Sequence, residues 1–251
     1  MRGIAGNTQT ATTTPDTPDA GPDRVEDIVV TAQRRGENLQ KVPIAITAIT
    51  AARLEAVGVD DSRDLAVLTP GLQAPSQAGY FQPRIRGVGT SSVGPGLENP
   101  VAVYVDGVYL ASSAASLFSY SGIDRIEVLK GPQGTLFGRN STGGLIQVVT
   151  RDPKGGFEGK ASATYGNYQD FIGDLYVAGG TSDAAAIDFG IRYETQGKGY
   201  GTNVALGRET NRRSDDLSLR SKLLLRPTDT LTLRLSGDYE YNKGSYPDIR
   251  T

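Results

Sequence analysis

Cysteine, histidine and tryptophan are all absent from these 251 residues. Without cysteine the chain has no disulfide framework, no thiol nucleophile and no thiolate metal site. Without histidine it also lacks the commonest general base and metal ligand. These absences count against most classes of enzyme, and we expect no enzymatic activity and no cofactor.

Charge of one sign and long apolar runs are missing as well. The net charge of −2 provides no global attraction to nucleic acid, which is not expected as a partner. No stretch approaches the ~18 consecutive apolar residues of a membrane-spanning helix, so any crossing of a membrane would have to use strands. The start, "MRGIAGNTQT", lacks the charged and apolar regions of a signal peptide.

Glycine is in excess, with 32 residues, while hydrophobic residues make up only 37% of the chain. Residues 1–24 consist mainly of Thr, Pro, Asp and Gly, a composition that predicts a flexible leader. The stretch "VEDIVVTAQRR" at 25–35 then places a β-prone segment, Ile28 to Ala32, between acids and arginines. Two interpretations are open: the first strand of a globular domain, or a tethered strand that can be added to the sheet of a partner.

Residues 36–153 predict a small α+β unit. "VPIAITAIT" alternates as a strand, after which Thr50 is placed to cap a short helix over 51–57 that Gly58 ends. A second helix is expected to begin near residue 61 or 62 and to end before Thr69. Asp106-Gly107 predicts a two-residue hairpin turn. The long connections at 73–82, 88–100 and 111–121 are of a length usually associated with function or disorder.

Residues 154–251 change to alternating apolar and polar positions. Five strands are predicted, around 157–165, 171–179, 186–194, 217–226 and 230–241, each close to the ~9–11 residues of a tilted membrane strand. Leu224 breaks the alternation of the fourth. Connections alternate between short (181–184, 227–230) and long (196–212), as in an outer-membrane barrel. A soluble antiparallel sandwich shows the same alternation and stays open.

Five strands cannot close a barrel. A plugged transporter barrel of ~22 strands needs at least ~220 residues in strands alone, whereas the chain has 99 residues from 153 to 251. We therefore expect that the chain is cut from a longer one. The glycine-rich stretch "KGPQGTLFGRNSTGG" at 130–144 fits neither a phosphate-binding loop nor a dinucleotide fingerprint, so it predicts packing and not catalysis.

Several motifs, in this order and spacing, resemble the TonB-dependent outer-membrane receptors of Gram-negative bacteria. They are "DIVVTAQRR", "VPIAITAI", "LAVLTPGL", "RIRGVG", "VAVYVDGVYL" and "IDRIEVLKGPQGTLFGRNSTGGLIQVVTRDP". The resemblance implies an α+β plug domain with a small mixed sheet, followed by antiparallel strands of an incomplete transmembrane β-barrel. It divides the chain into a leader (1–24), a TonB-box region (25–35), a plug (36–153) and barrel strands (154–251).

The resemblance also implies roles for particular residues. The box that the TonB protein of the inner membrane would bind by strand addition is Ile28, Val29, Val30, Thr31 and Ala32. Cations that would lock the plug to barrel carboxylates are Arg86 and Lys130, with Arg139 as a further contact to the barrel wall. Candidate ligand contacts in the long loops are Tyr80, Phe81, Gln82, Glu98, Asn99 and Tyr109.

These roles predict an importer in the outer membrane whose partners are the TonB periplasmic domain, outer-membrane lipids and a scarce ligand. A ferric siderophore is the expected ligand. The alternative is a truncated plug-type fragment that acts as a soluble binding module or has no function.

Overall fold

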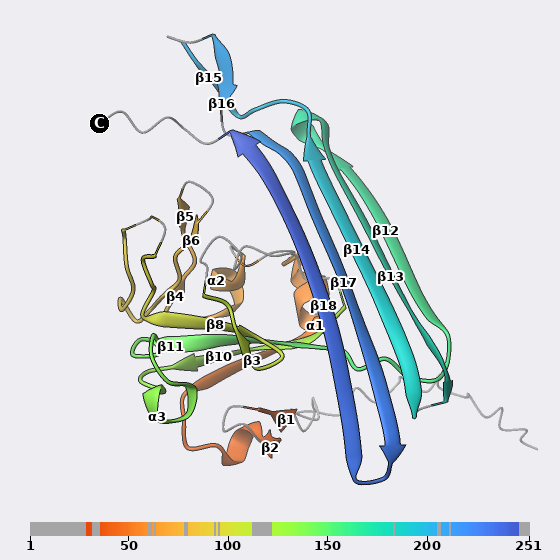
Figure 1. Ribbon diagram of the computed structural model, residues 1–251. Coiled ribbons are helices and arrows are strands. Elements are labelled where there is room, and N and C mark those ends of the chain that lie inside the picture. Colours follow the sequence, from red (N-terminus) through yellow and green to blue (C-terminus); the bar gives the residue numbers. More distant parts are fainter. Residues whose placement is uncertain are drawn as a thin grey trace, which may run out of the picture.

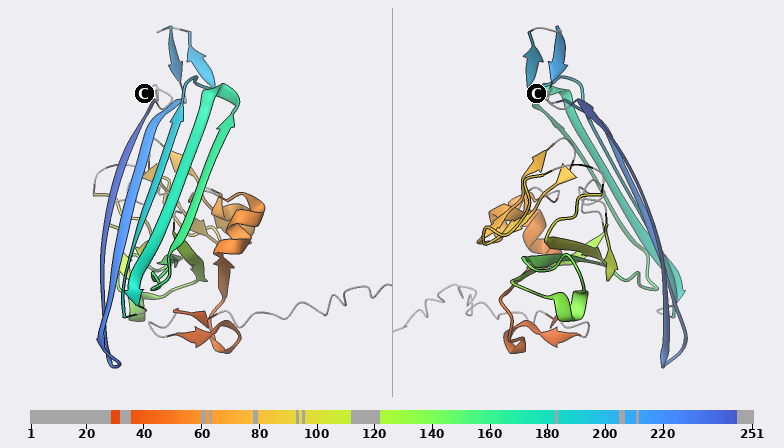
Figure 2. Two further views of the ribbon diagram at one scale, coloured as in Figure 1. Left: turned by 90° about the vertical axis from the view of Figure 1, so that its right-hand side faces the viewer. Right: turned by 60° about the vertical axis from the view of Figure 1, so that its left-hand side comes forward.

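The computed structural model describes residues 29–31, 36–59, 62, 64–77, 80–92, 94, 96–111, 122–182, 184–204, 207–210 and 212–245. A small mixed sheet with short helices lies beside a tall, curved antiparallel sheet, as Figure 1 shows. Figure 2 shows that the tall sheet curves along one side of the smaller unit. The leader at 1–24, with residues Ile28 and Ala32 of the predicted box, lies outside the described residues.

The smaller unit is built on a five-stranded sheet with the order β3-β10-β11-β8-β9. β11 pairs with β8 in parallel, and the other neighbours are antiparallel, so the expected mixed sheet is confirmed. β10 pairs with β3 on one side and with β11 on the other, so that Glu127 lies opposite Ala48 of β3 and Gln147 of β11. The bounds of the strands are β3 Ile46–Thr50, β8 Val101–Val105, β9 Val108–Tyr109, β10 Ile123–Lys130 and β11 Gly144–Thr150.

Local signals set the helices and the tightest turn. Thr50 accepts a hydrogen bond from the backbone N–H of Arg53 and begins α1, Ala51–Val57, which ends at Gly58 in the left-handed conformation, as predicted. α2 is shorter than predicted, because it spans only Leu65–Leu68. Asp106 and Gly107 both have positive φ, as the predicted hairpin turn requires.

Short elements complete the unit. β4 (Leu72–Gln73) pairs with β7 (Arg84–Ile85), and β5 (Ser76–Gln77) pairs with β6 (Tyr80–Phe81). β1 (Val29–Val30) pairs with β2 (Glu37–Asn38), which leads into η1 (Leu39–Lys41). α3 spans Gly134–Phe137 within the glycine-rich stretch.

The two faces of the mixed sheet pack against different partners. One face, with Ile126, Val128 and Ile146, packs against side chains of the helices and of β6 and β7. The other face, with Leu129 and Leu145, packs against α3 and the N-terminal segment. Three buried residues cover this second face: Val30 of β1, Val42 directly after η1, and Phe137 of α3.

The tall sheet has the order β12-β13-β14-β17-β18, with every pair antiparallel. The five predicted strands are present, but most are longer than expected. A short hairpin of β15 (Gly201–Asn203) and β16 (Arg208–Thr210) occupies the long connection, and η2 (Asn167–Gln169) joins the first two strands. The strands are β12 Glu158–Gly166, β13 Asp170–Ser182, β14 Ala185–Gln196, β17 Arg212–Thr228 and β18 Leu231–Ser245.

Burial in the tall sheet is the reverse of that in a soluble sandwich. On β14, Asp188, Arg192 and Glu194 are buried, while Ile187 and Phe189 are 53% and 42% exposed. Lys222 of β17 is 2% exposed, and Leu224 beside it, which breaks the alternation, is fully buried on the same inner face. A soluble sandwich buries its apolar face, so that alternative is wrong, and the apolar outer face suits lipid. Among the described residues, none of the helices is both long and apolar enough to cross a membrane.

Candidate functional site

The predicted box is docked onto the smaller unit. The backbone of Val29 and Val30 pairs with Asn38 and Glu37 of β2. Val30 is fully buried and packs in the cluster that contains Leu129. The described part of the box is therefore held by both strand pairing and apolar burial.

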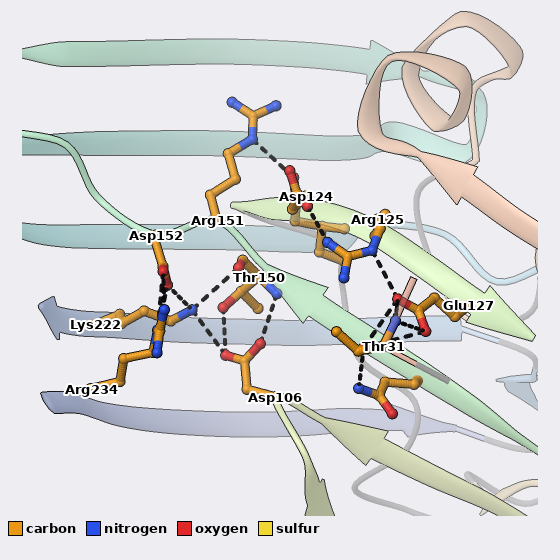
Figure 3. Close-up of polar contacts among 12 residues, drawn as sticks. Thr31, Asp106, Asp124, Arg125, Glu127, Thr150, Arg151, Asp152, Lys222 and Arg234 are labelled. Atoms are coloured by element: carbon orange, nitrogen blue, oxygen red, sulfur yellow. Dashed lines mark hydrogen bonds and ion pairs between the residues drawn. The ribbon is translucent and has the colours of Figure 1, made fainter. Parts of the chain in front are cut away.

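A buried carboxylate holds the next residue. The backbone N–H of Thr31 donates to both carboxylate oxygens of Glu127, at 2.9 and 3.0 Å. Its hydroxyl lies 3.1 and 3.3 Å from the same two oxygens and accepts a hydrogen bond from the Gln147 amide at 2.9 Å. Figure 3 shows Thr31 beside Glu127. We call Glu127, Arg125 and Gln147 the box seat.

Glu127 needs these partners because it lies on β10, an interior strand between β3 and β11, and its side chain is fully buried. Arg125 donates its Nε–H to one carboxylate oxygen at 2.8 Å and is itself held by Asp124 at 2.6 Å. A buried charge is costly unless it is paired and hydrogen-bonded. Thr31 supplies two of the donors that make this carboxylate tolerable, whereas the carbonyl oxygen of the Gln147 side chain has no hydrogen-bond partner.

A second polar cluster joins the smaller unit to the tall sheet. Lys222 of β17 lies 3.1 Å from Asp106 and 3.4 Å from Asp152, and its ammonium also donates to the Thr150 carbonyl at 3.2 Å. Figure 3 shows these side chains meeting between the sheets. We call the cluster the plug–wall anchor; it consists of Asp106, Thr150, Asp152, Arg220, Lys222 and Arg234.

The anchor is charge-complementary across the two units. Arg220 pairs with Asp106 at 3.0 Å, and Arg234 pairs with Asp152 at 2.8 Å, so the carboxylates come from one side and the cations from the other. Burial alone would raise the pKa of Asp152, but the hydrogen bond from Arg234 and the charges of Lys222 and Arg234 outweigh it and lower that pKa below its ordinary value. Asp152 is therefore ionised in the anchor at neutral pH.

A cavity of about 1320 Å³ lies between the box seat and the anchor. Thr31 and Gln147 line it on one side, while Asp106, Asp152 and Lys222 line it on the other. Both polar clusters therefore face the same open space. Movement of the box segment would change the wall of this cavity directly.

Two of the three predicted lock cations, Arg86 and Lys130, interact electrostatically. Burial lowers the pKa of the Lys130 ammonium, and the charge of Arg86 lowers it further. Arg86 is exposed and has a positive φ of 51°. Arg139 pairs with Glu98 at 3.1 Å, in the glycine-rich loop on the side of the plug away from the tall sheet in Figures 1 and 2. The contacts of these cations with barrel carboxylates stay predictions.

Four of the predicted ligand residues lie in the β5–β6 hairpin or beside a small cavity. Tyr80 is half-buried in the β5–β6 hairpin, whereas Phe81, Asn99 and Tyr109 line a small cavity of about 20 Å³.

Most of these side chains have contacts within the fold. Phe81 is 1% exposed, Gln82 donates to the Ser92 carbonyl at 2.6 Å, and Asn99 accepts from the Val101 N–H at 2.9 Å. Tyr109 accepts from the Asn140 amide at 2.8 Å. The role of the six residues toward a ligand stays a prediction.

Sequence reasoning missed the box seat and the anchor. Glu127 carried one signal, because it is an acid directly between the apolar residues Ile126 and Val128. Asp106 was interpreted only as a turn residue, although its carboxylate also accepts from the Thr150 N–H at 2.8 Å. Lys222 lay in a predicted strand with no indication of its partner. Among the described residues, no group of three or more acids is placed to hold a metal ion.

Comparisons with known proteins agree with this architecture. Residues 38–145 match the family model described as TonB-dependent Receptor Plug Domain. The chain is 31% identical over 141 residues to the pesticin receptor of Yersinia pestis, an alignment that covers 54% of this chain and 21% of that receptor. It is also 31% identical over 148 residues to the vitamin B12 transporter BtuB of Vibrio vulnificus, covering 56% and 23% of the two chains.

A solved structure extends the similarity beyond the plug. The ferric yersiniabactin uptake receptor FyuA from Yersinia pestis matches 78% of this chain and 31% of its own, with a TM-score of 0.66 and 25% identity. The chain thus spans less than a third of the length of these relatives, which are two receptors and a transporter. Residues 38–145 are therefore a TonB-dependent receptor plug domain, and they are followed by antiparallel strands that do not close a barrel, an arrangement similar to that of the solved outer-membrane receptor.

Proposed function

We propose that this protein imports a scarce ligand across the outer membrane with energy delivered by TonB through the box segment, and that the ligand is a ferric siderophore. The observation that carries the proposal is the position of the box. β1, which immediately precedes Thr31 in the sequence, lies at the end of the plug near the short turns of the tall sheet, as Figure 1 shows. Short turns face the periplasm in outer-membrane barrels, and TonB acts from that side.

The opposite end of the plug suits ligand capture. The β5–β6 hairpin, which carries Tyr80, extends toward the end of the tall sheet where β15 and β16 form the long connection (Figure 1). Long connections face the outside in such barrels. A ligand bound there and a TonB protein bound at the box would therefore contact opposite ends of one plug.

The plug–wall anchor suggests which part of the plug remains fixed. β3 lies at one edge of the mixed sheet and is the first strand after the box, β2 and η1 in the sequence. Asp106 and Thr150 of the anchor belong to the other part of this sheet, at the ends of β8 and β11. Tension applied at Thr31 would reach β3 before it reaches β8 and β11. We propose that the edge next to the box is displaced and that the cavity beside the anchor widens to form the path.

The class of ligand rests on the relatives. One solved relative is a ferric yersiniabactin uptake receptor, whereas another relative is a vitamin B12 transporter. A ferric siderophore is our first candidate and vitamin B12 the second. A plug-type fragment without transport activity remains the alternative to both.

Uptake assays separate these possibilities. The full-length protein is produced in a Gram-negative host that lacks its own copy, and entry of radiolabelled ferric siderophores and of vitamin B12 is measured. The matched pair is Val30→Pro and Val30→Ala: proline removes the backbone N–H that strand addition needs, whereas alanine keeps it. We expect ferric-siderophore uptake that survives in the alanine variant and is lost in the proline variant. Uptake of neither compound would contradict import.

A further inference from the structure

We propose that Glu127 holds the box segment closed and thereby sets how readily TonB can bind it. This inference rests on the proposed function, because it concerns the same contact with TonB. Three observations carry it: the bonds of Thr31 to Glu127, the burial of Val30, and the pairing of β1 with β2. The docked segment is already engaged in the kinds of contact that strand addition would require.

The docked state competes with TonB for the same backbone. A strand added to a partner's sheet must offer its backbone groups and set its side chains on that partner. The Thr31 N–H is instead directed at Glu127 within 3.0 Å, and Val30 has no exposed surface. Binding therefore requires release, and the apparent affinity falls in proportion to the fraction of molecules in which the box is free.

A carboxylate is the group that makes this position act as a latch. Both of its oxygens accept hydrogen bonds, so it accommodates the N–H and the hydroxyl of Thr31 at once. Arg125 offsets its charge from one side only, at 2.8 Å. Release of Thr31 would leave a buried carboxylate with fewer donors, which is unfavourable until water or another donor enters from the adjoining cavity. Glu127 is thus a positioning residue whose effect is exerted through Thr31.

Glutamine at this position tests the latch. Glu127→Gln keeps the size of the side chain, removes its charge and turns one of the two acceptors into a donor. The affinity of a purified TonB periplasmic domain is measured for the full-length protein in detergent and for a free peptide spanning residues 25–35. We expect the wild-type protein to bind more weakly than the peptide, and Glu127→Gln to bind about tenfold more tightly than wild type, equivalent to about 1.4 kcal/mol.

Glu55→Gln is the matched control, since it makes the same chemical change on α1 at a side chain that is 54% exposed, pairs with Lys160 and has no bond to Thr31 or to the box seat. Its affinity for the TonB domain should equal that of wild type. Hydrogen exchange adds a readout that general loosening would not reproduce: the Thr31 amide should exchange faster in Glu127→Gln while amides of β10 and β11 stay protected.

The outcomes are distinguishable. If the peptide itself does not bind, the proposed function fails. If the peptide binds but Glu127→Gln and wild-type protein have the same affinity, the latch is overturned and the import proposal stands. Should Glu127→Gln not fold, Thr31→Val is introduced into both protein and peptide, so that direct effects on TonB cancel in the ratio of their affinities. If the ratio of the peptide's affinity to the protein's affinity for the TonB domain moves several-fold toward one, the latch is supported. An unchanged ratio overturns it.

Discussion

Replacement of Lys222 by methionine should loosen the plug from the wall, because methionine keeps the length of the side chain and removes its charge. The Lys222 side chain is 3% exposed, and its ammonium lies within 3.4 Å of two carboxylates. Loss of one partner from a buried charge pair costs about 3–5 kcal/mol. Arg220 and Arg234 remain beside the carboxylates, which are 22% and 33% exposed, so we expect a loss below that range, of about 2 kcal/mol.

The loss can be measured by urea titration of the full-length protein in detergent. Because these 251 residues contain no cysteine, a cysteine introduced at Ala52, an exposed position that lines the cavity, provides a label for a fluorophore on the plug. With a urea dependence of about 2 kcal/mol per molar, the plug transition should move down by about 1 M. Lys243→Met, at an exposed position of β18, is the control. Equal urea midpoints for the two variants would refute the proposed stabilisation of the plug by the plug–wall anchor.

Three further predictions concern the same fold. The pKa of Asp152 is lowered in the anchor, so the stabilisation by its carboxylate is present above the ordinary pKa and is lost as the pH falls through the lowered value. The urea midpoint of the plug transition should therefore decrease below about pH 4, and Asp152→Asn should abolish that decrease. Gly144→Ala should lower the plug midpoint by about 1 M, because Gly144 has a φ of 138° and an added Cβ would lie 2.3 Å from a backbone oxygen. Gly134→Ala, with open space around it, should not, and equal midpoints would contradict this account. Phe189→Arg should reduce assembly into vesicles by about 2–4 kcal/mol if the outer face meets lipid, whereas Thr202→Arg in β15 should leave assembly unchanged.

Features set by neighbouring residues could be predicted from the sequence. Thr50 and Gly58 begin and end α1 through bonds that stay within the helix, and Asp106-Gly107 forms its turn locally. The alternation of the later strands also predicted which side chains share a face, because a strand places successive residues on opposite faces. Their lengths were underestimated, since strands such as β17, with 17 residues, continue beyond the apolar core of the pattern.

Features that depend on distant residues could not be predicted from periodicity. Thr31 and Glu127 are 96 positions apart, and neither residue indicates the other in the sequence. The sequence placed Lys222 in a strand, but its position between two plug carboxylates depends on how the plug packs against the wall. The resemblance to the receptor family supplied the box and the plug, whereas the contacts of the box became visible only once the sheet register placed Glu127 beneath it.

We propose that TonB binds residues 28–32 and delivers energy through this contact. The most direct measurement is a titration of the peptide 25–35 against the purified periplasmic domain of the TonB protein from the same bacterium, with Val30→Pro beside it. Saturable binding that the proline variant loses is the predicted result, because strand addition depends on backbone hydrogen bonds. Absence of binding, or equal binding by the proline variant, would contradict the account.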